Sequence, residues 1–255
     1  MGKIQDEFKI VNKLQPTETC FDYSIYCPEL AEITQAGQFV HIYCGEKTLR
    51  RPISVCQTNK QKGIIRIVFE IRGEGTLWLS KRKKGEFLNI LGPLGNGFPT
   101  DKNKKALLIG GGIGVPPLLE CSKCYSSESS SILGFRSQEN AILIEDFIKN
   151  CAEVYIATED GTLGTKGFVT DVLNDLLAHE TFDVICACGP TPMLKAVSHA
   201  ALCNSIECFV SMEERMACGI GACLVCACKT KKDGKEGYSH VCKNGPVFNA
   251  QEVVW

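Results

Sequence analysis

Short apolar runs separated by polar or glycine-containing turns fill the first hundred residues. Two examples are QFVHIYC at 38–44 and GIIRIVFEI at 63–71. Runs of this length, bounded by turn residues, are typical of antiparallel strands in a small barrel. We therefore predict an antiparallel β-barrel domain over residues 1–100.

The pattern changes from about residue 104. ALLIGGG at 106–112 reads as a buried strand that ends in glycines, VPPLLECSKCY at 115–125 as a helix, and SILGFR at 131–136 as the next strand. The alternation continues as far as TFDVICACG at 181–189. Alternating strands and helices are typical of a parallel sheet covered by helices, so a second, α/β domain is expected over 104–204.

Beyond Asn204 neither periodicity holds. The stretch SMEERMACGIGACLVCACKTKKDG at 211–234 contains four cysteines and three glycines. It is predicted to be a site within a small third module over 207–255, and the charged run KTKKDGKEG is expected to be an exposed hairpin turn. The predicted fold class is therefore α/β and multi-domain.

Composition narrows the function classes. With 255 residues, 44% of them apolar, the chain can bury a sizeable core, and its formal net charge of -1 gives little attraction to nucleic acid or anionic lipid. No apolar stretch approaches the 18 or so residues of a membrane span, and the start MGKIQDEFKI lacks a signal-peptide core. We expect a soluble cytoplasmic protein with no nucleic-acid or membrane partner.

The chain has 16 cysteines. In a chain long enough to fold without disulfides, most are expected to be reduced and to behave as small buried hydrophobes. Cys121 and Cys124 form a CxxC, but no second pair follows at zinc-finger spacing, so a core position is favoured over a redox or metal role.

Four other cysteines have a spacing that indicates a metal cluster. Cys218, Cys223, Cys226 and Cys242 fall as C-x4-C-x2-C-x15-C, the order of a plant-type [2Fe-2S] ligand run. Structural zinc is the main competitor, although all-cysteine zinc sites usually come as two CxxC-like pairs. Cys228 is expected to face away from the iron.

Two segments of the predicted barrel suit a flavin. Arg51, Pro52, Ile53 and Ser54 follow an apolar strand and can offer a guanidinium to phosphate and a hydroxyl to a flavin ring. Gly73-Glu74-Gly75-Thr76 opens a helical stretch and can present backbone amides to a pyrophosphate. Either segment alone could be an edge turn, but together they favour flavin.

Two turns of the α/β domain suit a dinucleotide. Gly110, Gly111, Gly112 and Gly114 lie between a buried strand and a helix, where backbone can approach a phosphate closely, although the standard GxGxxG pattern is absent. Cys188-Gly189-Pro190 leaves another buried strand and could face a nicotinamide ring.

Taken in order, these segments resemble a known superfamily. RRPIS, GEGT, GPLGNGF, GGGIGVPP, CGPTPM, EERMACGIGACLVCACK and VCKNGPVF are similar to motifs of the ferredoxin reductases. More narrowly, the chain resembles the electron-transfer subunits of class 1B dihydroorotate dehydrogenases over nearly its whole length. The cysteine-rich tail with its GPVF ending is the narrowest marker.

The resemblance implies an N-terminal FAD barrel, a central nicotinamide domain and a C-terminal [2Fe-2S] module. Arg51 to Ser54 would line FAD, Gly75 and Thr76 would hold its pyrophosphate, and the four cysteines would bind a [2Fe-2S] cluster. A further FAD contact falls at Val68, Phe69 and Glu70, where the family more commonly has an aromatic residue followed by arginine.

The resemblance also implies a function. The chain would pass electrons between NAD(H) and the FMN of a separate dihydroorotate dehydrogenase catalytic subunit, in a heterotetramer of two plus two, without an acid, base or nucleophile of its own. The alternatives are a subunit of a sulfide-dehydrogenase-like or NAD(P)H:ferredoxin oxidoreductase, and a non-enzymatic iron–sulfur sensor. Resemblance favours NADH over NADPH, although Arg136-Ser137-Gln138 could accept a ribose phosphate and no acidic residue stands nearby.

Overall fold

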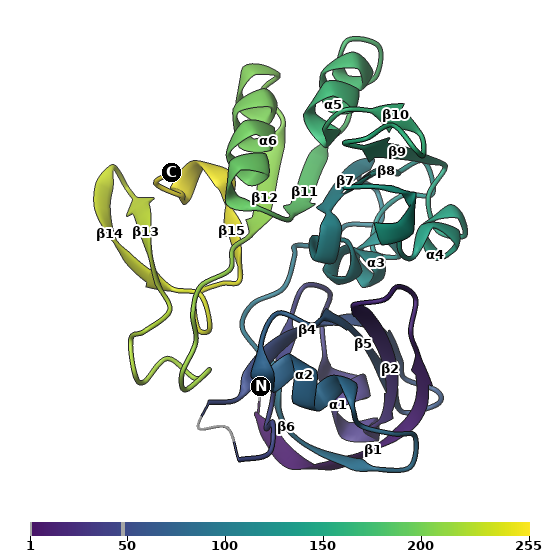
Figure 1. Ribbon diagram of the computed structural model, residues 1–255. Helices are drawn as coiled ribbons and strands as arrows, with labels where there is room; N and C mark the ends of the chain where they lie inside the picture. Colours follow the sequence, from purple (N-terminus) through teal and green to yellow (C-terminus); the bar gives the residue numbers. More distant parts are fainter. Residues whose placement is uncertain (1, 47–48) are drawn as a thin grey trace.

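The computed structural model describes residues 2–46 and 49–255. Its N-terminal part is a closed antiparallel barrel (Figure 1). Its strands close in the order β1-β2-β5-β4-β3-β6. The predicted barrel is therefore confirmed. The strands are β1(Ile4–Leu14), β2(Cys20–Tyr26), β3(Phe39–Ile42), β4(Arg51–Asn59), β5(Ile64–Glu70) and β6(Phe87–Leu94), with two short helices, α1(Pro28–Ile33) and α2(Glu74–Ser80).

Strand alternation separates the two faces of the barrel wall. On β3, Val40 and Ile42 belong to the core cluster that fills the barrel. Phe39 and His41 alternate with them along the strand and so point outward, yet both are buried. Phe39 packs in a different cluster, together with Cys226 and Cys242 of the C-terminal part. The outer face of β3 is therefore covered by the chain's C-terminal part.

The central part is a seven-stranded sheet, ordered β10-β9-β8-β7-β11-β12-β15, in which every pairing is parallel except that of β12 with β15. The predicted parallel α/β architecture is confirmed. Its strands are β7(Ala106–Gly111), β8(Ser130–Phe135), β9(Glu153–Thr158), β10(Thr165–Lys166), β11(Val184–Cys188), β12(Glu207–Ser211) and β15(Val247–Asn249).

Helices cover both faces of this sheet. Leu107 and Ile109 of β7 pack on one face with α5(Val169–Leu177) and α6(Thr191–Cys203), whereas Ala106 and Leu108 pack on the other with α3(Pro116–Ser122) and α4(Ile144–Ile148). This period of two explains why β7 is apolar throughout. Short 3-10 turns complete the connections at η1(Gly112–Gly114), η2(Gln138–Asn140) and η3(Ala250–Glu252). Within the described residues, no helix has the length and hydropathy of a membrane span.

The C-terminal part lies beside both the barrel and the sheet (Figure 1). The loop between β12 and β13 carries the cysteines and descends from the sheet toward the barrel (Figure 1). β13(Ala227–Lys232) and β14(Lys235–His240) form an antiparallel hairpin that turns at Asp233 and Gly234, where the charged run predicts a turn. β12 and β15 fall within the predicted third module, 207–255, but they pair in the central sheet. The domain boundaries drawn from the sequence remain predictions.

A buried ion pair connects the barrel to the sheet domain. The Arg66 guanidinium on β5 lies 2.7 Å from the Asp22 carboxylate on β2 and 3.1 Å from Asp146 on α4. The side chain of Asp22 is only 4% exposed. A buried carboxylate without a charged partner is energetically costly, so Arg66 stabilises the barrel wall by pairing with Asp22. Through Asp146 the same guanidinium also holds the neighbouring domain against the barrel.

We predict that Arg66→Met lowers the free energy of unfolding by about 3–5 kcal/mol, because it leaves the Asp22 charge buried without its partner. Chemical denaturation measures the loss. Lys60→Met is the matched control, since the Lys60–Glu32 pair is exposed and should contribute less than about 1 kcal/mol. Equal effects of the two substitutions would contradict this account.

Candidate functional site

The four predicted ligand cysteines come together in two pairs. The side chains of Cys218 and Cys223 lie within hydrogen-bonding reach of each other, as do those of Cys226 and Cys242. Cys226 and Cys242 are buried, whereas Cys218 is half-buried and Cys223 is exposed. The loop that carries the first three cysteines is therefore near the surface at Cys218 and Cys223 and buried at Cys226.

Backbone amides point at the sulfurs of this loop. The N–H groups of Ile220, Ala222 and Cys223 donate to Cys218 Sγ at 3.4, 3.3 and 3.4 Å. Burial raises the pKa of Cys218, but these hydrogen bonds outweigh it and lower the pKa to about 6. Cys242 N–H likewise donates to Cys226 Sγ at 3.4 Å. Such donors stabilise thiolates, the form in which sulfur binds iron.

The second pair is held differently. Burial, with Cys226 close by, raises the pKa of Cys242 to about 12. Metal binding at this pair would therefore displace a proton. Across residues 2–46 and 49–255, no three His, Cys, Asp or Glu side chains converge tightly enough for a single ion. Two separate thiol pairs suit two irons better than one zinc, whose four sulfurs lie about 2.3 Å from one centre.

Cys228 and the CxxC cysteines lie apart from these pairs. The Cys228 thiol is buried in the β13–β14 hairpin and donates to the Ser239 carbonyl at 3.5 Å. Cys121 is wholly buried against the sheet, and burial raises its pKa strongly. A buried thiol with a raised pKa is unreactive, in keeping with a core role.

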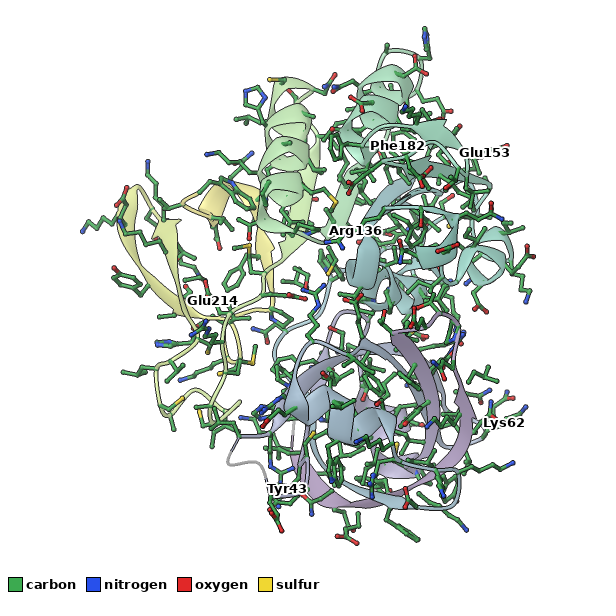
Figure 2. The ribbon with its side chains drawn as sticks, viewed as in Figure 1. Tyr43, Lys62, Arg136, Glu153, Phe182 and Glu214 are labelled. Atoms are coloured by element: carbon green, nitrogen blue, oxygen red, sulfur yellow. The ribbon has the colours of Figure 1, made fainter. Side chains whose placement is uncertain are left out.

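A cavity of about 210 Å³ lies on the outer wall of the barrel where the C-terminal segment crosses it. It gathers most of the predicted flavin residues. They are Pro52, Ile53, Ser54, Val68, Phe69, Glu70 and Thr76. Phe39, Arg72 and the segment Ser211–Met216 also contribute, and Figure 2 labels Glu214 from that segment. An apolar wall with a few hydroxyl and charged groups suits a flavin ring.

Arg51 and Gly75, the remaining flavin predictions, lie against each other beside this cavity. A Cβ on Gly75 would stand 2.4 Å from Arg51 Nε, so only a glycine leaves the guanidinium its place at the start of α2. A guanidinium beside the backbone amides of a helix start is a donor set that fits a pyrophosphate. Glu70, the residue that departs from the family pattern, is paired with Arg72 at 3.0 Å. Arg72 therefore supplies a positive charge two residues later.

A second, larger cavity of about 890 Å³ lies at the carboxyl edge of the sheet. It takes in the predicted Gly111, Gly112, Gly114, Gly189 and Pro190. A Cβ on Gly114 would stand 2.4 Å from the Cys188 carbonyl oxygen, so the two glycine turns touch through backbone. This edge is where open α/β sheets bind nucleotides.

Gly110 and Cys188 are not at the surface of this cavity. They are buried register partners on β7 and β11, one residue back from the turns that line it. Burial raises the pKa of Cys188 to about 12. Their place in the structure is to bring the two turns together.

The two cavities share four lining residues, Glu70, Arg72, Ile113 and Glu213. Only Glu70 was among the predicted cofactor contacts. Ile113 and Glu213 lie inside motifs quoted above but were given no role, and Arg72 lies in none of them. Glu213 lies two residues beyond the end of β12, at the carboxyl edge of the sheet, and that position was the available signal. A nicotinamide in the larger cavity and a flavin in the smaller one would meet at this shared wall.

The histidines differ in setting. His179 and His199 are exposed, and His240 is half-buried. His41 is wholly buried on β3, where burial, with Arg50 nearby, lowers its pKa to about 4. Its ring is therefore neutral at physiological pH.

Comparison with known proteins agrees with this arrangement. Residues 213–254 match the family model described as the iron-sulfur cluster binding domain of dihydroorotate dehydrogenase B. The chain is 44% identical over 233 residues to a protein of Fusobacterium nucleatum, with 87% of this chain and 88% of that protein covered. That protein is named dihydroorotate dehydrogenase B (NAD(+)), electron transfer subunit. A Geobacillus protein of the same name is 40% identical, with 98% of each covered.

The chain belongs to the dihydroorotate dehydrogenase B electron transfer subunit family. The resemblance read from the motifs is thereby confirmed. Among solved structures, a chain of an NADH-dependent reduced ferredoxin-NADP oxidoreductase is similar with a TM-score of 0.87 and 31% identity, covering 97% of this chain and 90% of that chain. A ferredoxin reductase of carbazole 1,9a-dioxygenase, at 21% identity and TM-score 0.64, covers 81% of this chain and 67% of that one and shares the fold.

We predict that Gly75→Ala lowers FAD affinity about tenfold or more, because the added methyl displaces Arg51 and with it a charge-assisted contact of roughly 1.5–3 kcal/mol. Flavin content after purification and titration of the apoprotein with FAD measure it. Gly73→Ala is the matched control, since its Cβ would meet nothing within 4 Å. If Gly73→Ala loses as much FAD as Gly75→Ala, the assignment of Arg51 and Gly75 fails.

Proposed function

We propose that this chain carries electrons between NAD(H) and the FMN of a separate dihydroorotate dehydrogenase catalytic subunit, and so couples oxidation of dihydroorotate to reduction of NAD+ in pyrimidine biosynthesis. One observation carries the proposal. The flavin-type cavity shares Glu70, Arg72, Ile113 and Glu213 with the dinucleotide-type cavity, while two residues beyond its Phe39 the His41 ring lies against Gly219, next to Cys218. The dinucleotide-type cavity, the flavin-type cavity and the cysteine loop therefore lie next to one another in that order.

Each cofactor is assigned to residues already described. FAD is held by Arg51 to Ser54, Val68 to Glu70, Gly75 and Thr76, and NAD(H) by the turns at Gly110 to Gly114 and Cys188 to Pro190. Cys218 and Cys223 would hold one iron of a [2Fe-2S] centre, and Cys226 and Cys242 the other. When bound, a flavin accepts two electrons as a hydride and releases them singly, which is the exchange that a nicotinamide and an iron–sulfur centre require.

The chain's own residues orient and insulate these groups. Ile113 and Glu213 line both cavities, so they fix where a nicotinamide can lie against the flavin wall. Phe39, Met212, Met216 and Pro246 close the flavin cavity on the side of the cysteine module and exclude water there. Electron transfer needs only this proximity, so no acid, base or nucleophile of this chain takes part.

The catalytic subunit is proposed to dock at the cysteine loop. Ile220, Leu224 and Val225 are 42%, 59% and 52% exposed and flank the exposed Cys223. Exposed apolar side chains around a redox centre suit an interface through which electrons leave. We propose a cytoplasmic heterotetramer of two catalytic and two electron-transfer subunits.

The 31% identity to an NADH-dependent ferredoxin-NADP oxidoreductase chain keeps a second candidate function in view, because that architecture serves a different partner. Anaerobic copurification with the neighbouring subunit separates the two. An FMN-containing partner that reduces orotate with NADH supports our proposal. A larger flavin and [4Fe-4S] partner contradicts it.

We predict that Cys226→Ser abolishes electron transfer to the catalytic subunit while FAD binding and flavin reduction by NADH remain. Loss of one thiolate removes a ligand of the iron centre but touches no residue assigned to FAD. Iron, acid-labile sulfide and flavin analysis, with stopped-flow reduction, measures it. Cys228→Ser, two residues along the same segment, is the matched control and should keep both iron and coupled activity. Stoichiometric zinc without labile sulfide in the unsubstituted protein would refute the iron assignment.

We also predict faster flavin reduction by NADH than by NADPH. The Glu159 carboxylate follows β9 and lines the dinucleotide cavity. Arg136, which follows the neighbouring strand β8 and is labelled in Figure 2, lines it too. A carboxylate such as that of Glu159 is suited to bind the free hydroxyls of a ribose. Glu159→Gln should narrow the preference by about tenfold, the value of one charge-assisted hydrogen bond. Reduction rates with both nucleotides check this, and a clear preference of the unsubstituted protein for NADPH would overturn it.

A further inference from the structure

His41 stands on β3 between two of the sites described above. Its cross-strand partner on β4 is Pro52, which lines the flavin cavity. Phe39, two residues earlier on the same outward face, lines that cavity and belongs to the same core cluster as Cys226 and Cys242. His41 itself has no exposed surface. Its ring therefore lies in the protein layer that separates the flavin cavity from the cysteine loop.

The ring touches the loop at the first ligand. A Cβ on Gly219 would stand 2.6 Å from His41 Nδ1, and Gly219 has a left-handed φ of +71°. The loop thus passes over the imidazole where a side chain would not fit. Backbone groups of Cys218 and Arg50 also face the ring.

Both ring nitrogens are nevertheless buried without a hydrogen-bond partner of regular geometry. Buried polar groups are almost always paired, and a neutral imidazole brings one donor and one acceptor. An apolar residue would fill the same space without this cost. The Cys218 and Arg50 backbones are the groups in place to pair with the ring, and only the Cys218 backbone belongs to the cysteine loop. A polar side chain at this position is therefore suited to hold that end of the loop.

We propose that His41 is a positioning residue for electron exchange, which holds the Cys218 end of the cysteine loop against the outer face of β3 and so fixes the separation between the flavin cavity and the iron ligands. This inference rests on the proposed function. In the exchange, reduced flavin loses one electron and the oxidised iron centre gains it. No bond or proton of His41 changes.

The test compares His41→Phe, which keeps an aromatic ring but no nitrogen, with His41→Asn, which keeps a donor. His41→Phe should retain FAD, iron and sulfide and be reduced by NADH at the normal rate. Subsequent reduction of the iron centre by flavin should slow about tenfold or more, with a shifted midpoint potential, as when a contact behind a metal ligand is lost. His41→Asn should recover most of the rate. His199→Phe, the same change on the exposed face of α6, should alter neither value.

Unchanged cluster reduction and potential in His41→Phe would overturn the proposal, and so would equal losses in His41→Phe and His41→Asn. If His41→Phe does not retain iron, Gly219→Ala replaces it, because the added methyl pushes the loop away from an intact His41. Slower cluster reduction in an iron-containing Gly219→Ala protein supports the proposal, and a normal rate refutes it. Failure of the proposed function is distinguishable, since the unsubstituted protein would then lack the iron centre or show no flavin reduction by NADH.

Discussion

The burial of the outer face of β3 is the contact on which the arrangement depends. A barrel strand ordinarily has one face in the core and one in water. Here Val40 and Ile42 fill the barrel, while Phe39 and His41 are covered by the cysteine-bearing segment. This double burial joins the first and last thirds of the chain. It brings the flavin cavity, formed mainly by the barrel, next to thiols that come much later in the sequence.

Much of the fold follows from local patterning. Short apolar runs gave the barrel, and alternating strands and helices gave the parallel sheet, because periods of 2 and 3.6 reflect which side of an element is buried. The hairpin at Asp233 and Gly234 could be placed because turn chemistry is local. The cysteine spacing could single out a ligand set because three of the four thiols lie within nine residues, but how the thiols pair could not be read from it.

What the sequence did not reveal depends on long-range contacts. β12 and β15 join the central sheet through pairings that no periodicity encodes. Nothing in the sequence assigned a role to Arg72 or Glu213, and only the meeting of the barrel with the sheet places both on the wall shared by the two cavities. Nor did the sequence set His41 apart from the other three histidines. Only the structure shows that the Gly219 turn packs against the His41 ring and that both ring nitrogens lack a hydrogen-bond partner of regular geometry.

The apolar collar of Ile220, Leu224 and Val225 has a practical consequence for the isolated subunit. Produced without its partner, the chain would present three exposed apolar side chains and a solvent-accessible thiol, Cys223, on one edge of the molecule. Self-association and attack by dissolved oxygen would then compete with correct assembly. If the partner docks there as proposed, co-expression with it in the absence of air would shield this edge, and a preparation made otherwise would be judged inactive for reasons unrelated to its chemistry.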